Sequence, residues 1–132
     1  MALSPELLTF VRSAVRLPSE VLKKIDREWD RLYPHRVVLT EVVQSNDQVR
    51  RDASELREYV LAEARRAAAE HPGEQLIPED TAEAVLPTAR ALLLRGILEN
   101  SPDPRRVQAF AALTEPFRDI VPGIRQRSNG QR

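Results

Sequence analysis

The chain has 132 residues, the size of one domain, and its 20 basic and 20 acidic residues leave a formal net charge of zero. The absence of cysteine excludes disulfide scaffolds, thiolate zinc sites and cysteine nucleophiles, and the balanced charge argues against a protein that coats nucleic acid. No segment approaches the roughly 20 apolar residues that span a bilayer, and the N-terminus lacks the pattern of a secretory signal, so we expect a cytoplasmic protein without membrane contact.

The first two predicted helices begin beside prolines. Ser4 is a favourable N-cap, and Pro5 fits the first position of the helix that follows, because no N–H is needed there. After Pro18, apolar residues recur at spacings of three and four, which indicates a second helix that ends at Pro34. Trp29, the only tryptophan, lies on the apolar face of that helix, and we therefore expect it to anchor the core.

The longest uninterrupted segment runs from His35 to His71 and contains neither glycine nor proline. Apolar residues repeat along it with the period of a helix, so the pattern predicts one helix over about residues 36–70. The β-branched segment Val37–Val43 is also typical of a strand, but no second segment offers a partner, and a helix is favoured. One such helix would span roughly 55 Å, whereas a compact chain of this length has a diameter of roughly 35–40 Å.

A break near Ser45 is the alternative to a single helix. Ser45-Asn46-Asp47-Gln48 has the S-x-x-Q form of a capping box, in which Ser45 starts a new helix and the segment folds back within one chain. In the other interpretation, Asn46 is a polar residue inside an apolar stripe, a device that fixes the register of two paired helices. A continuous helix would expose an apolar edge, and we expect a second copy to cover that edge in a homodimer. The residues of this expected interface are Val42, Asn46, Val49, Leu56 and Val60.

An acidic stretch follows the long segment, which His71-Pro72-Gly73 is expected to end. From Glu70 to Glu83 the chain carries five acidic residues and no lysine or arginine. We expect this stretch to be exposed, where its charge suits the N-terminus of the next helix and aids solubility. The alternative is that it meets a basic protein partner.

The C-terminal half predicts two further helical segments. Pro78 opens the first, and Pro87 inside it is expected to kink or split it. The last part of this segment, Ala89–Leu98, is apolar on most sides and is expected to be the most buried helix. Asp103 is the expected N-cap of the second segment, and Pro116 is expected to bend it. The expected core consists of Trp29, Leu92, Leu93, Ile97, Phe110 and Phe117.

Together these patterns predict an all-α bundle of five to six helices. Its long central helix covers about residues 36–70, unless it breaks near Ser45. Residues 1–124 are expected to form a single helical domain, and the polar residues 125–132 are expected to form a disordered tail.

No catalytic motif emerges from the sequence. The glycine-rich phosphate loops, the G-x-S-x-G nucleophile elbow and the H-E-x-x-H metal motif are absent. His35 and His71 each lie next to a proline and are expected in surface loops rather than in a shared metal site. The carboxylates lie on solvated helix faces, which leaves no candidate pair for general acid–base catalysis. We therefore expect no catalytic, cofactor-binding or metal site, and no enzyme activity.

The favoured hypothesis is a non-catalytic, self-associating helical interaction module, a small regulatory or scaffold protein. One alternative is a DNA-binding regulator that uses the helix pair 89–99 and 104–121, with Arg105, Arg106 and Gln108 at the front of a recognition helix. However, 18 of the 20 basic residues are arginine, which we attribute to codon bias, and nucleic acid is the less favoured partner. The second alternative is an enzyme or small-ligand binder with an unrecognised site.

Overall fold

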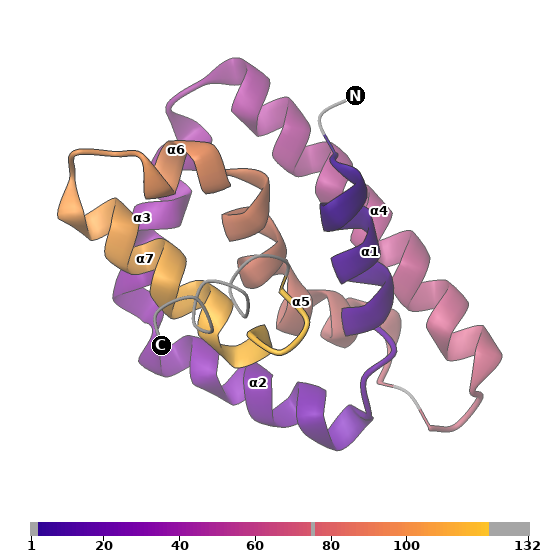
Figure 1. Ribbon diagram of the computed structural model, residues 1–132. Coiled ribbons are helices and arrows are strands. Elements are labelled where there is room, and N and C mark those ends of the chain that lie inside the picture. The colour runs from indigo at the N-terminus through magenta and orange to yellow at the C-terminus, as the bar shows by residue number, and fades with distance from the viewer. Residues whose placement is uncertain (1–2, 75, 122–132) are drawn as a thin grey trace.

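The structure, a computed structural model, describes residues 3–74 and 76–121 (Figure 1). Over these residues it contains seven α-helices, one short 3-10 helix and no strand, so the all-α fold expected from the sequence is confirmed. The α-helices are α1 (Pro5–Ala14), α2 (Ser19–Arg31), α3 (Tyr33–Gln44), α4 (Asp47–Glu70), α5 (Pro78–Leu93), α6 (Arg95–Glu99) and α7 (Pro104–Thr114), and the 3-10 helix is Glu115–Phe117. None of the described helices combines the length and apolar character needed to cross a membrane. The tail expected over residues 125–132 lies outside the described residues.

Two predicted helix starts have the expected side-chain caps. The Ser4 hydroxyl accepts a hydrogen bond from the Leu7 N–H at 3.2 Å, which satisfies one free N–H of the first turn of α1. The Asp103 carboxylate accepts from the Arg105 N–H at 2.9 Å at the start of α7. A proline follows each capping residue, where its missing N–H removes no helical hydrogen bond.

The long segment is broken at Ser45 and Asn46 rather than continuous. The Ser45 hydroxyl donates to the Val42 carbonyl at 2.7 Å and closes the end of α3. The Asn46 side chain accepts from the N–H groups of Gln48 and Val49, at 2.7 and 3.2 Å, and so begins α4. Of the two alternatives that the sequence left open, the break is therefore the one that the structure shows, and the single helix over about residues 36–70 does not form. The capping residue is Asn46 instead of Ser45. The segment Val37–Val43 lies within α3 and is helical.

Helix α5 is the centre of the fold (Figure 1). It contacts each of the other α-helices in the described part of the chain. Its residues Thr81–Ala91 are buried except for Glu83 and Arg90. The predicted split at Pro87 does not occur, because α5 continues through this buried proline and ends only before Leu94. Packing on all sides stabilises a helix that proline alone would destabilise.

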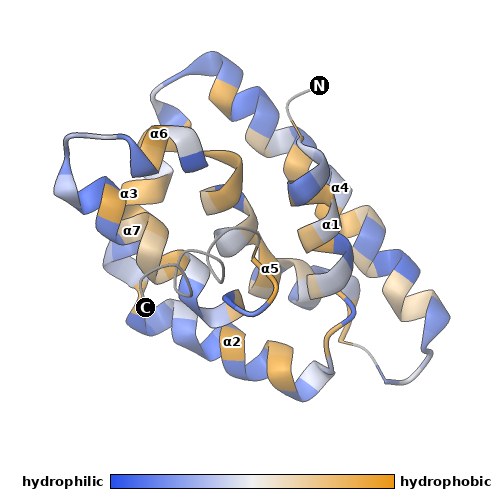
Figure 2. Cartoon of the chain, in the orientation of Figure 1, coloured by the Kyte–Doolittle hydropathy of each residue, from blue (hydrophilic) through white to orange (hydrophobic). Residues whose placement is uncertain are grey.

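The aromatic part of the predicted core is confirmed. Trp29 is buried, and its indole N–H donates to the Ala84 carbonyl at 2.9 Å, which ties α2 to α5. Phe110 and Phe117 are also buried, and the Phe117 ring packs edge to face on Phe10 with 5.4 Å between the centroids. Figure 2 shows hydrophobic residues on the inner sides of the helices and hydrophilic residues on the outer sides of α2 and α4.

The aliphatic part of the predicted core needs a correction. Leu92 and Leu93 are only half-buried, and Ile97 is 42% exposed. Leu94 and Leu98 are buried in their place. The reason is the break between α5 and α6, because it turns the apolar stripe and brings a different set of leucines to the inner side.

We predict that Leu98→Ala lowers the free energy of unfolding by about 2–5 kcal/mol, since it leaves a cavity at a fully buried position. The neighbouring exposed residue gives the matched control, and Ile97→Ala is expected to change stability by less than about 0.5 kcal/mol. Urea unfolding measures both. Equal losses for the two variants would contradict the described packing of α6.

Candidate functional site

A groove separates α3 from α5. Helix α3 packs along α7, and α4 packs along α5, which leaves a hollow of about 560 Å³ between α3 and α5. This volume lies within the range of sites that bind small molecules or single side chains of a partner. We call it the α3–α5 groove, and the residues that matter most in its lining are Tyr33, Arg36, Val37, Glu83, Leu86, Pro87 and Arg90.

Arg90 is the most unusual residue of this groove. It is half-buried, its Nε atom is fully buried, and neither a hydrogen bond to Nε nor an ion pair to its guanidinium occurs within the described residues. Burial lowers the pKa of Arg90, and nearby Arg57 lowers it further, against an opposing effect of Glu83. A base whose pKa falls on folding carries its charge at the expense of stability at neutral pH.

Arg36 adds a second cation to the groove. Its guanidinium Nη1 donates to the Trp29 carbonyl at 3.3 Å. This carbonyl is in the last turn of α2, where helix geometry leaves carbonyl groups without helical partners. Because Trp29 is itself fixed to the Ala84 carbonyl, Arg36 is held at the junction of α2, α3 and α5.

The remaining lining of the groove mixes apolar residues with Thr40, Glu41, Gln44 and Glu83, and it has one exposed apolar rim. Leu86 and Pro87 are buried and form the side that belongs to α5. Pro87 has no N–H to donate to the Glu83 carbonyl one turn earlier, so the backbone adds an acceptor here. On α3, Tyr33 and Val37 are one helical turn apart, and they are 61% and 36% exposed. The groove therefore combines two cations and two carboxylates, Glu41 and Glu83, with accessible apolar surface.

A neighbouring hollow, which lies between α2 and the start of α5, is more acidic than the groove. Asp26, Asp30, Asp80 and Glu83 contribute carboxylates to it, and Arg36 and Glu83 line both hollows. We call this the acidic hollow. Burial and the nearby carboxylates, Glu83 first among them, raise the pKa of Asp26. In the parts of the chain that the structure describes, no group of three or more histidine and carboxylate residues is arranged to hold a metal ion.

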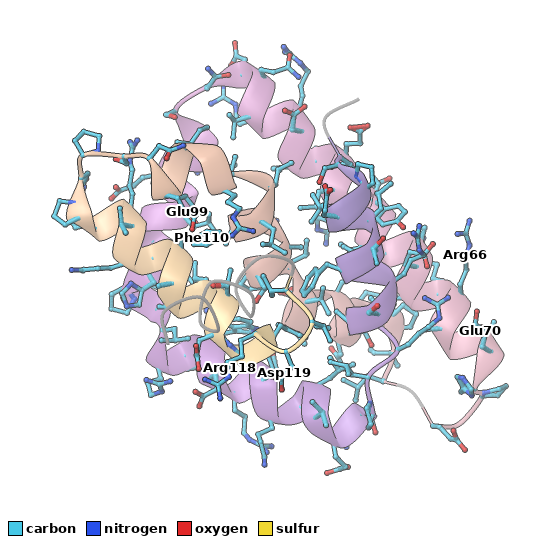
Figure 3. The ribbon with its side chains drawn as sticks, viewed as in Figure 1. Arg66, Glu70, Glu99, Phe110, Arg118 and Asp119 are labelled. Atoms are coloured by element: carbon cyan, nitrogen blue, oxygen red, sulfur yellow. The ribbon has the colours of Figure 1, made fainter. Side chains whose placement is uncertain are left out.

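Several other buried or half-buried charges of the molecule are in ion pairs, whereas Arg36, Asp52 and Arg106, like Arg90, are half-buried without an ion pair among the described residues. Glu63 of α4 is buried and accepts from Arg16 at 3.2 Å and from Arg66 at 2.6 Å. Arg16 of the chain segment after α1 also pairs with Glu70 at 2.9 Å, and this contact lowers the pKa of Glu70. Figure 3 shows Arg66 and Glu70 along α4. These ion pairs join the N-terminal segment to α4 and serve the fold.

The residues expected to pair two long helices do not form an exposed edge. Val42, Leu56 and Val60 are buried within the chain's own core, and Val49 is half-buried. Asn46 is exposed and caps α4 with its side chain, so it does not lie in an apolar stripe. This correction follows from the break in the long segment, which folds the apolar face inward. The homodimer itself stays a prediction, but it needs a different surface.

The residues of the DNA-binding alternative also have a structural role. Arg105 lies at the start of α7, where it pairs with Asp103 at 3.0 Å and approaches Glu41 of α3 at 3.9 Å. Arg106 is half-buried and Gln108 is exposed. Carboxylates thus compensate the leading cation of the proposed recognition helix. The DNA-binding alternative stays an untested prediction.

The remaining expectations concern the histidines and the acidic stretch. His35 lies in the first turn of α3, rather than in a loop, and His71 caps the C-terminus of α4. The acidic side chains of the stretch, namely Glu70, Glu74, Glu79, Asp80 and Glu83, are exposed as expected. A basic protein partner for these side chains stays a prediction.

Sequence reasoning missed Arg36 and Arg90. One signal was available, because Arg90 is the only charged residue in the apolar segment Ala84–Leu94 and follows a helix-internal proline by three positions. In a chain so rich in arginine, however, a single arginine does not stand out. Its significance comes from the packing of α3 near α5, which is not a local property of the sequence.

We predict that Arg90→Met raises the free energy of unfolding by about 0.5–2 kcal/mol. Methionine keeps much of the length of the side chain and removes a half-buried charge that opposes folding. Arg65→Met, at an exposed position of α4 outside both hollows, is the control and is expected to change stability by less than about 0.5 kcal/mol. If Arg90→Met were instead clearly destabilising, the charge would have a stabilising partner in solution.

Comparison with known proteins finds no family model, no curated protein and no solved structure that matches this chain. The charges and shape of the α3–α5 groove are therefore the observations that bear on function.

Proposed function

We propose that the chain is a non-catalytic helical interaction module that binds a segment of a protein partner in the α3–α5 groove. The observation that carries this proposal is the half-buried Arg90 charge, which lies beside an accessible apolar rim. Residues that lower stability without an evident structural role are typical of binding sites. Arg90 fits that description, whereas the paired arginines of the molecule do not.

The chemistry of the groove selects a carboxylate beside an apolar side chain. A guanidinium presents a planar set of donors that matches a carboxylate, and such charge-assisted hydrogen bonds are among the strongest in proteins. Arg36 and Arg90 both line the groove, beside Glu41 and Glu83, and supply those donors. Tyr33 and Val37 would bury exposed apolar surface against the partner, which contributes the hydrophobic part of the binding free energy.

The shape of the surface favours a polypeptide over a small metabolite. Tyr33 and Val37 line the α3–α5 groove on one side and a second hollow of about 440 Å³ on the other, where Arg105 and Gln108 contribute polar groups. The ridge between two hollows is an extended surface, which suits a segment with several side chains.

Binding without catalysis is the interpretation that the lining supports. The Thr40 hydroxyl donates to the Arg36 carbonyl of its own helix at 3.0 Å, and so it is engaged in backbone bonding. The described lining places no histidine or cysteine in the groove. Arg36 and Arg90 offer hydrogen-bond donors and Tyr33 offers apolar surface, which are the properties of a binding surface.

We expect selection from a displayed library of random peptides to enrich sequences with aspartate or glutamate beside an aromatic or branched apolar residue. Arg90→Met should weaken a selected peptide about tenfold or more, because it removes a charged hydrogen-bond donor, while the surface control Arg65→Met should leave the affinity unchanged. Titration calorimetry with the synthetic peptide measures both. Enrichment of basic peptides, or equal binding by Arg90→Met, would contradict the proposal.

A further inference from the structure

The two carboxylates of the α3–α5 groove limit which segment it can bind. Glu41 and Glu83 line the groove together with Arg36 and Arg90, so a segment that carries only acidic residues would meet like charge there. Arg105 of α7 approaches Glu41 at 3.9 Å and compensates part of its charge. Glu83 is exposed and has no ion pair within the described residues. Glu83 is therefore the groove carboxylate that a basic group of a partner can reach.

Glu83 and Arg90 are the two points at which the middle of α5 reaches the surface. Every other residue of this helix between Thr81 and Ala91 is buried. The two residues are seven positions apart, close to two helical turns, so they lie on nearly the same face. Their separation along the helix axis is about 10 Å. Pro87 lies between them, and the accessible part of α5 is thus a carboxylate, an apolar wall and a guanidinium, in that order.

The end of the groove at Glu83 is acidic. Glu83 also belongs to the acidic hollow, whose four carboxylates outnumber its two arginines. Burial raises the pKa of Asp26 in this hollow and Glu83 raises it further, whereas Arg36 lowers it. A basic group of a partner at Glu83 would reduce the repulsion among these carboxylates.

The end of the groove at Arg90 is basic. Burial lowers the pKa of Arg90, and Arg57 of α4 lowers it by more than Glu83 raises it. An acidic group of a partner would offset both effects, since a guanidinium binds a carboxylate through charge-assisted hydrogen bonds. The two ends of the groove therefore favour groups of opposite charge.

We infer that the partner segment is dipolar, with a carboxylate side chain for Arg90 and, about 10 Å away, a basic side chain for Glu83. Between the two charges the segment carries an apolar side chain, which packs on Pro87 and on the rim formed by Tyr33 and Val37. This inference rests on the proposed function and adds the order and the spacing of the partner's charges.

The separation of Glu83 and Arg90 converts to a spacing in the sequence of the partner. An extended segment of the polyproline type returns to the same side every three residues, which spans about 9 Å. A helix returns to nearly the same side after seven residues, which spans about 10 Å. We therefore expect the acidic and the basic residue of the partner three or seven positions apart.

A double-mutant cycle between the protein and a peptide tests the pairing at Glu83. The peptide is one that the wild-type chain selects from a displayed random library, and its variant carries glutamine in place of the basic residue. This replacement should weaken binding to the wild-type chain about threefold to fivefold, which corresponds to an exposed ion pair. It should leave binding to Glu83→Gln unchanged, because the carboxylate is then absent. Titration calorimetry measures all four affinities.

Glu79→Gln is the matched control for Glu83→Gln. It removes the same charge from an exposed position of α5 outside both hollows, so the basic residue of the peptide should keep its full effect on affinity. Charge reversal adds a gain of function, since Glu83→Lys should prefer a peptide with glutamate in place of the basic residue. Circular dichroism of each variant confirms that the chain is folded before binding is measured.

The outcomes separate this inference from the proposed function. Selected peptides without a basic residue at either spacing overturn the dipolar partner, and so does a glutamine replacement that weakens binding equally to the wild-type chain and to Glu83→Gln. If those peptides still lose affinity for Arg90→Met, the proposed function stands and the carboxylate alone is recognised. If no peptide binds through Arg90, both fail.

Discussion

Helix α5 packs against every other α-helix of the described residues, and the rest of the structure depends on this packing. In a helix that is buried along most of its length, each polar side chain has to form a hydrogen bond or lie at a gap between the surrounding helices. Thr88 satisfies the first condition, because its hydroxyl donates to the Leu113 carbonyl of α7 at 2.6 Å. Arg90 meets the second, at the gap that α3 leaves where it follows α7. The groove therefore results from the way in which the other helices pack around α5.

Ion pairs compensate several of the buried and half-buried charges of this molecule. The buried Glu63 has two arginine partners, and half-buried Arg95 pairs with Glu99 at 2.9 Å and stacks on the Phe110 ring. Such pairs compensate much of the free energy lost when a charge leaves water. Arg90 lacks an ion pair within the described residues, so its charge is available to a partner. Binding of a carboxylate would then compensate the free energy that folding loses by burying the Arg90 charge. The stability of the chain is in this way coupled to its proposed function.

Local signals predicted much of the fold, and non-local packing decided what they missed. Ser4 and Asp103 cap their helices as expected, because capping involves only the residue and the turn that follows. The break near Ser45 was one of two alternatives, because the capping-box pattern competed with the interpretation of Asn46 as a polar residue inside a continuous apolar stripe. Ile97 was wrongly placed in the core because the break at Leu94 shifts the apolar stripe, and no strong helix-stop residue marks that break. The groove depends on where α3 lies relative to α5, which the sequence does not indicate.

The central claim is that the Arg90 guanidinium binds a carboxylate of a partner segment, and titration of the protein with a selected acidic peptide, followed by arginine side-chain signals in nitrogen-15 NMR, tests this most directly. We expect the Arg90 signal to move as the peptide is added, because the guanidinium then gains a charged acceptor. The signal of the exposed Arg65 on α4 should stay fixed over the same titration. An Arg90 signal that is unchanged while calorimetry shows the peptide binding would contradict the account.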